Sequence, residues 1–204
     1  MPTPPPLDAS RPLSVTEAHR RFVALGVPFW IAGGQAIDLF LGRRTRAHGD
    51  IDIAMLRADA EALRQLDDEF EFYVVVGTGK LTPWRDPLSE DQHQFWAHRR
   101  GGDAWSFEVL LERHDGDRWL FRRNRAVSLP LATFGRITPG GIPIVAPEVA
   151  LLYKAAHLEI DRNVADFALA SPALDENARQ WLQEAIKTAH GASHAWHAML
   201  LRGT

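Results

Sequence analysis

Two apolar runs, with a glycine pair and an amphipathic segment between them, constrain the fold of this chain most strongly. Residues 27–32 have the composition of a short buried strand, which ends at Gly33 and Gly34. Apolar residues at helical spacing follow as far as Leu41, and a second apolar run, DIDIAML, covers residues 50–56. A strand, a helix and a second strand in this order predict an α/β or α+β sheet.

The rest of the chain predicts a mixed sheet followed by helices. Ser14 and Glu17 have the spacing of a capping box, which indicates a helix that stops at Gly26. We expect a helix over residues 59–69, a strand over residues 70–76, and a hairpin formed by residues 93–98 and 105–111. Two further short strands are expected within residues 116–121 and 142–147.

The sequence pattern changes after Pro147: apolar residues recur at helical spacing, and few turn residues interrupt them. We therefore predict three parts. Residues 1–12 form a disordered proline-rich arm, residues 13–146 form a mixed domain of strands and helices, and residues 147–204 form a small helical domain.

Composition narrows the classes of function. The net charge of −3 and the pI near 6.3 show no basic excess, which disfavours a nucleic-acid partner. The absence of cysteine excludes disulfides and thiolate metal sites. No apolar run approaches the roughly 18 residues that span a bilayer, and the N-terminus lacks a signal-peptide pattern, so we expect a cytoplasmic protein without a membrane partner.

Asp50 and Asp52 interrupt a run that otherwise predicts a buried strand. Because alternate residues of a strand point to the same side, the two carboxylates share one face, opposite Ile51 and Ile53. Like charges so close raise each other's pKa, and their burial is costly. A divalent cation such as Mg²⁺ would compensate both. The alternative is an exposed strand end, where the aspartates cap turns or pair with arginines.

A third carboxylate favours the metal site. Glu108 interrupts the apolar run WSFEVLLE in the same way as the aspartates. If the two strands are neighbours in one sheet, Glu108 can approach Asp50 and Asp52, and three acids could hold one or two metal ions that bridge the phosphates of a nucleotide. The Gly33–Gly34 turn, at the start of a helix, predicts a binding site for an anion.

These features resemble the polymerase-beta-like nucleotidyltransferase superfamily. The segment GGQAIDLFLGRRTRAHGDIDIAMLRAD is similar to that of the aminoglycoside 2''-adenylyltransferase-related family, and the later segments keep the likeness to about residue 190. The resemblance implies an α+β fold in which helices flank a mixed nucleotidyltransferase-type sheet and a small C-terminal helical part follows. It also implies an antibiotic-resistance type of enzyme that uses Mg²⁺ to transfer a nucleoside monophosphate from an NTP, expected to be ATP, to a hydroxyl group.

The family's functional residues transfer to this sequence by position. Asp50, Asp52 and Glu108 would bind one or two Mg²⁺ ions, with Glu108 acting either as a ligand or as the general base. Gly33, Gly34, Gln35 and Lys154 would bind the nucleotide. Arg46, which flanks the acids in the sequence, is a further nucleotide-binding candidate that could pair either with the acids or with phosphate. The sequence departs from the family at Gln35, where tryptophan is usual, and at Glu108, where aspartate is usual.

Three functions compete. A small-molecule acceptor, with aminoglycosides as the candidate type, agrees best with the resemblance. A protein acceptor of the toxin–antitoxin kind, or an RNA acceptor, would use the same chemistry. A non-catalytic nucleotide-binding domain would need a broken set of acids, and here all three acids are present.

Two tryptophans near the acids, Trp84 and Trp96, could stack on a base or a sugar, with packing in the core as the alternative for each.

Overall fold

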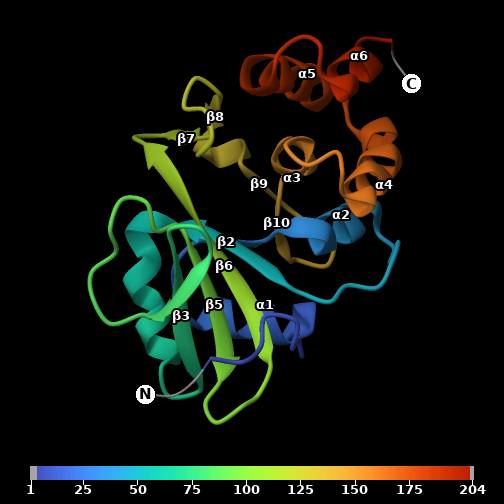
Figure 1. Cartoon of the computed structure of the whole chain (residues 1–204). Coiled ribbons are helices and arrows are strands. Elements are labelled where there is room, and N and C mark those ends of the chain that lie inside the picture. Colours follow the sequence, from blue (N-terminus) through green and yellow to red (C-terminus); the bar gives the residue numbers. More distant parts are fainter. Residues whose placement is uncertain (1–3, 203–204) are drawn as a thin grey trace. The chain divides into compact units, whose positions relative to one another are not determined.

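The computed structural model describes residues 4–202 (Figure 1). The chain divides into two compact units. Unit 1 comprises the residues up to Ile31 together with Ala47–Glu112, and unit 2 comprises Ala32–Arg46 together with the residues from Arg113 onward. The two units meet at residues 31/32, 46/47 and 112/113. The predicted domain boundary near residue 146 does not coincide with any of these and remains a prediction.

Unit 1 is a twisted sheet with α1 and a 3₁₀ segment packed beside it. The strands follow the order β4-β3-β5-β6-β2-β1; β2 and β6 are parallel, and the other neighbours are antiparallel. The elements are α1 (Val15–Ala24), β1 (Phe29–Ile31), β2 (Asp52–Leu56), η1 (Arg57–Leu66), β3 (Phe70–Val76), β4 (Lys80–Pro83), β5 (Gln94–Arg99) and the first part of β6 (Trp105–Asp115).

One face of this sheet is buried by aromatic packing. Phe22 of α1 is fully buried, and its ring lies 5.5 Å from that of Phe29 and 5.6 Å from that of Phe107. Ile53 and Val109 have no exposed surface either. Since side chains alternate along a strand, the residues between these apolar ones project from the opposite face, and those are the carboxylates of β2 and β6.

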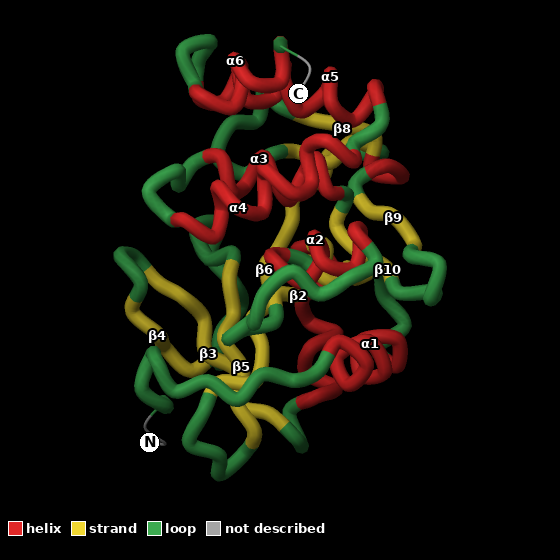
Figure 2. The backbone as a smooth tube through the Cα atoms, turned by 90° about the vertical axis from the view of Figure 1, so that its right-hand side faces the viewer, coloured by secondary structure: helices red, strands yellow, loops and turns green. Residues whose placement is uncertain are grey.

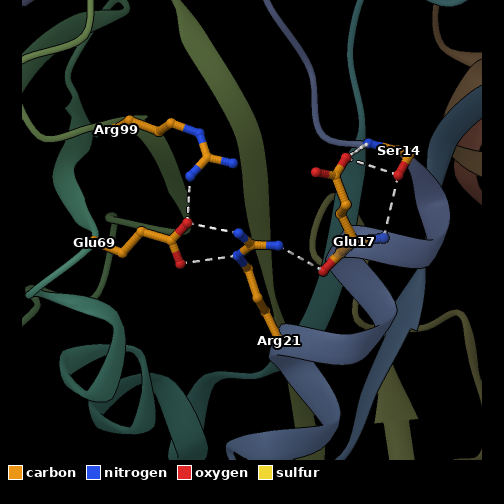
Figure 3. Close-up of polar contacts among 5 residues, drawn as sticks. All are labelled: Ser14, Glu17, Arg21, Glu69 and Arg99. Carbon is orange, nitrogen blue, oxygen red and sulfur yellow. Dashed lines mark hydrogen bonds and ion pairs between the residues drawn. The ribbon is translucent and has the colours of Figure 1, made fainter.

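A capping box begins α1, and ion pairs connect this helix with the turn before β3 (Figure 3). The Ser14 hydroxyl accepts from the Glu17 backbone N–H and the Glu17 carboxylate accepts from the Ser14 backbone N–H, which is the predicted capping box. Arg21 donates from Nε and Nη2 to the two oxygens of Glu69, at 3.0 and 2.6 Å, and Arg99 also donates to Glu69. The bonds from Arg21 are the main reason why the pKa of Glu69 is lowered.

Glu69→Gln is expected to destabilise unit 1 by roughly 1 kcal/mol at pH 7, because two arginines lose their anionic partner at a partly exposed site. A carboxyl whose folded pKa is lowered stabilises the fold above its unfolded pKa, near 4.3, and loses this effect as the pH falls through the folded value. Urea unfolding of wild type and variant should therefore differ at pH 7, and the difference should shrink as the pH falls from about 4.3 through the folded pKa of Glu69.

Glu61→Gln is the matched control, because Glu61 is 71% exposed and its contact with Arg64 spans 3.7 Å. A difference between wild type and Glu69→Gln that persists unchanged at pH 3 would contradict the assigned role of the carboxylate.

Unit 2 combines a cluster of helices with short strands (Figure 2). Helices α2, α3 and α4 contact one another, α5 packs on α3, and α6 packs on α5. Two antiparallel strand pairs, β7–β8 and β9–β10, accompany them. The elements are α2 (Gly33–Leu41), β7 (Arg118–Leu120), β8 (Ser128–Pro130), η2 (Leu131–Thr133), β9 (Gly135–Ile137), β10 (Pro143–Val145), α3 (Pro147–Ala155), α4 (Asp161–Ala170), η3 (Ser171–Ala173), α5 (Glu176–His190) and α6 (Ala195–Leu201).

The predicted α+β fold is confirmed, with mixed strand directions and helices at the C-terminal end. Some local features differ from the prediction. The segment expected as a helix over residues 59–69 is the 3₁₀ segment η1, and β4, which pairs with β3 through the turn at Gly77–Gly79, was not expected. Across residues 4–202, no helix is both long and apolar enough to span a membrane.

The expectation of a disordered arm does not hold for residues 4–12, and residues 1–3 lie outside the described part. Backbone hydrogen bonds join Ala9 and Arg11 to Trp105, at 2.8 Å each. The proline-rich composition removes N–H donors, but the remaining donors and the carbonyls pair with β6.

Candidate functional site

Parallel pairing of β2 with β6 brings the predicted acids together. Asp52 is the register partner of Glu108, and the backbone N–H of Glu108 donates to Ile51 O at 2.9 Å. Paired residues of neighbouring strands project to the same face, so these two carboxylates stand side by side. Asp50 lies two residues before the first residue of β2 and lines the same pocket as Glu108. The strands that carry Asp52 and Glu108 are therefore neighbours, and the site formed by the three acids stays a prediction.

Residues of β5 complete this face next to Glu108. Trp96 is the register partner of Glu108 on the other side, and Gln94 donates from Nε2 to Glu108 Oε2 at 2.5 Å. Asp50, Asp52 and Glu108 are each half-buried, so they remain accessible on the face that α1 does not cover. The bond from Gln94 fixes the direction of the Glu108 side chain.

A small pocket opens beside two of the three acids. Its volume is about 120 Å³, and its lining includes Asp50, Glu108, Trp96 and Trp105 together with Leu7 and Ser10 from the N-terminal arm. The walls thus combine carboxylates with aromatic and aliphatic surface. Such a lining suits a group that carries a positive charge on an apolar ring.

The donor set fits a hard divalent cation. Mg²⁺ prefers oxygen ligands and is commonly held by one or two carboxylates together with phosphate oxygens of the substrate. Asp52 and Glu108, from adjacent strands, and the nearby Asp50 supply such oxygens. Among residues 4–202, no group of three or more histidine, aspartate or glutamate side chains is by itself arranged to hold a metal ion.

The predicted phosphate-binding glycines begin helix α2 in unit 2. Gly33 has φ of +61°, a conformation that other residues rarely adopt, and the first turn closes with a bond from Ala36 N to Ala32 O at 3.2 Å. Since alanine at the N-cap has no side-chain acceptor, the amides of Gly33, Gly34 and Gln35 keep the orientation that binds anions.

Two predicted cations, Arg46 and Lys154, share a buried carboxylate in unit 2. The Asp166 side chain is 1% exposed, and its Oδ2 lies 2.9 Å from Lys154 Nζ and 3.3 Å from Arg46 Nη2. Asn163 Oδ1 accepts from Lys154 at 3.4 Å. Asp166 therefore joins the two predicted cations in one buried cluster.

Sequence reasoning missed Asp166, Gln94 and the contribution of the arm. Asp166 lies on the same side of α4 as the buried Asn163 and Phe167, and a carboxylate on a buried stripe is the signal that could have revealed it. Of the two tryptophans, Trp84 is buried, with the Arg64 guanidinium 3.5 Å above its ring, so it packs in the core. Trp96 lines the pocket.

Comparisons with known proteins agree with this arrangement. Residues 14–114 match the family model described as aminoglycoside-2''-adenylyltransferase. The match contains Asp50, Asp52, Glu108 and the glycine pair, whereas the predicted likeness of the segments beyond residue 114 remains a prediction. No protein with a curated description matches the sequence.

Three solved structures share the fold. The crystal structure of ANT(2'')-Ia in complex with adenylyl-2''-tobramycin is 20% identical, with a TM-score of 0.53 over 84% of this chain and 95% of that one. The solution structure of the antibiotic-resistance factor ANT(2'')-Ia is 21% identical, with a TM-score of 0.56 over 91% and 97%. Lincomycin-bound LnuA, a lincosamide antibiotic adenylyltransferase, is 13% identical, with a TM-score of 0.55 over 79% and 96%.

The motif of glycines and acids, the parallel pairing that joins the acids and the family match all lead to one assignment. Residues 14–114 form a segment of the aminoglycoside-2''-adenylyltransferase family, and the chain has the fold of the solved nucleotidyltransferases.

Proposed function

We propose that this chain transfers AMP from ATP to a hydroxyl group of a small, amine-bearing acceptor of the aminoglycoside type. The observation that carries the proposal is the register of Asp52 with Glu108, with Asp50 in the lining of the same pocket as Glu108. The family description and the ligands named for the solved relatives, tobramycin and lincomycin, support a small antibiotic as the acceptor class.

Each part of the reaction has a candidate residue. Asp50 and Asp52 would hold Mg²⁺, which when bound neutralises charge on the triphosphate and on the leaving pyrophosphate. Glu108 would serve either as a third ligand or as the base that takes the proton of the acceptor hydroxyl. The acceptor oxygen bonds to the α-phosphorus while the bond from that phosphorus to the bridging oxygen of the β-phosphate breaks, which releases pyrophosphate.

The nucleotide phosphates would bind to the second group of residues. The amides of Gly33, Gly34 and Gln35 offer hydrogen bonds at a helix N-terminus, and Arg46 and Lys154 offer positive charge. The use of ATP as co-substrate agrees with the expected cytoplasmic location. Both the location and the preference for adenine remain predictions.

One assay distinguishes between the alternative acceptors. Purified chain, ATP and Mg²⁺ are incubated with tobramycin, with lincomycin, or with a protein extract, and released pyrophosphate and the masses of the acceptors are measured. We expect pyrophosphate release and an AMP adduct on an amine-bearing antibiotic. An adduct on protein alone would favour the toxin–antitoxin type, and nucleotide binding without any turnover would favour a non-catalytic domain.

Glu108→Gln separates the two roles of that residue within the assay. Loss of transfer with unchanged binding of Mn²⁺ in the presence of a non-hydrolysable ATP analogue would identify a base. Loss of both would identify a ligand.

A further inference from the structure

The N-terminal arm occupies an edge of β6 that β2 leaves open. Trp105 N donates to Ala9 O and Arg11 N donates to Trp105 O, each at 2.8 Å, and Leu13 N donates to Ser106 O at 2.9 Å. Ser10 and Trp105 form a parallel β-bridge. Residues 6–13, which comprise the later part of the arm and Leu13, therefore add a short strand-like segment to the sheet of unit 1.

The arm lies on the same edge of β6 as β2. Backbone groups two residues apart in a strand face the same way, and Ser106 O bonds to the arm while Glu108 N bonds to Ile51. Strand β2 begins only at Asp52, opposite Glu108. The arm thus fills the edge just ahead of β2, next to the peptide that leads into Asp50.

Two side-chain contacts fasten the arm at this junction. The Ser10 hydroxyl donates to the carbonyl of Gly49, the residue directly before Asp50. The Trp105 indole donates from Nε1 to Pro6 O at 3.0 Å. The first contact restrains the backbone that carries an acid of the site, and the second positions an aromatic wall of the pocket.

The pocket beside the acids is closed in part by the arm. Leu7, Ser10 and Pro12 line it together with Trp96 and the two carboxylates. A volume of about 120 Å³ is well below the ~300 Å³ of a typical ligand site, so it has room for one substituent or part of a ring. Leu7 is 64% exposed, so a bound ring would cover apolar surface that solvent now contacts.

We propose that the arm is a specificity-determining wall of the acceptor site: Leu7 contacts one amine-bearing ring of the acceptor, and Ser10 is a positioning residue that holds the Gly49–Asp50 peptide. This inference rests on the proposed function. The family match starts at residue 14, so the arm is a feature of this chain outside the matched segment.

Tobramycin binding to the full chain, measured by calorimetry without ATP, tests the arm apart from catalysis. Leu7→Ala and Ser10→Ala are each expected to weaken binding by about fivefold to tenfold, the size of a small apolar contact or one restrained loop. Val23→Ala is the matched control, because Val23 is a similarly exposed apolar residue of unit 1, at 56%, outside the pocket lining. Ser10→Thr keeps the hydroxyl and should restore binding.

In steady-state kinetics, Leu7→Ala and Ser10→Ala should raise the KM for the acceptor by the same factor of about five to ten. The KM for ATP should stay unchanged within twofold. Equal binding of tobramycin by all variants would overturn the role of the arm and leave the proposed function intact, provided that the wild type still releases pyrophosphate. Failure of the wild type to bind tobramycin at millimolar concentration would overturn the inference as well. Failure of the proposed function shows itself separately, as no pyrophosphate release with any acceptor.

Discussion

Asp52→Asn is expected to lower the rate of AMP transfer by at least about 1,000-fold, which corresponds to roughly 4 kcal/mol of transition-state stabilisation. The substitution keeps the size of the side chain but removes the charge that a divalent cation needs. Asp52 opens β2 opposite Glu108 and is only half-buried, so the neutral amide should be accommodated without loss of the fold. Pyrophosphate release and the acceptor mass are the measurements, with circular dichroism to verify folding.

Asp68→Asn is the control for this variant, because Asp68 is an exposed aspartate of unit 1 in the turn before β3. It should retain the wild-type rate. Full activity of both Asp50→Asn and Asp52→Asn would exclude the metal assignment, whereas loss of activity with a collapsed circular-dichroism spectrum would point to a purely structural role.

Asp166→Ala is expected to destabilise the protein by about 3 kcal/mol or more, because the buried Lys154 ammonium loses its anionic partner. The Asp166 side chain is 1% exposed and contacts both Lys154 and Arg46, whose side chains are 12% and 26% exposed. Urea unfolding gives the free energy of unfolding. A change below 1 kcal/mol would show that the cluster contributes little.

A second substitution distinguishes the loss of charge balance from the loss of packing. Asp166→Leu combined with Lys154→Met removes one charge of each sign and keeps apolar volume, so it should recover a large part of the lost stability. Glu184→Ala serves as the exposed control, since Glu184 meets Lys187 at 3.3 Å with more than half of each side chain in solvent, and should cost less than about 1 kcal/mol.

Local sequence signals predicted helices and strands well where a capping or stop residue stood at the end of a regular apolar pattern. Ser14 and Glu17 indicated the start of α1, and Gly42, with φ of +65°, ends α2. Residues 59–69 were less predictable, because a short amphipathic segment supports a 3₁₀ or an α-helical path equally and its packing on β2 decides. The strand β4 has an alternation too short for recognition.

The sequence by itself determined the chemistry: which residues alternate on a strand, that Asp50, Asp52 and Glu108 interrupt apolar runs, and that two glycines open a helix. These are properties of period and composition, which neighbours along the chain fix. Only the tertiary structure decided that β2 and β6 pair in parallel with Asp52 opposite Glu108, that Asp166 joins Arg46 to Lys154, and that the arm lies beside Asp50. Strand pairing and ion pairing between distant residues depend on how the whole core packs, and no local pattern encodes them.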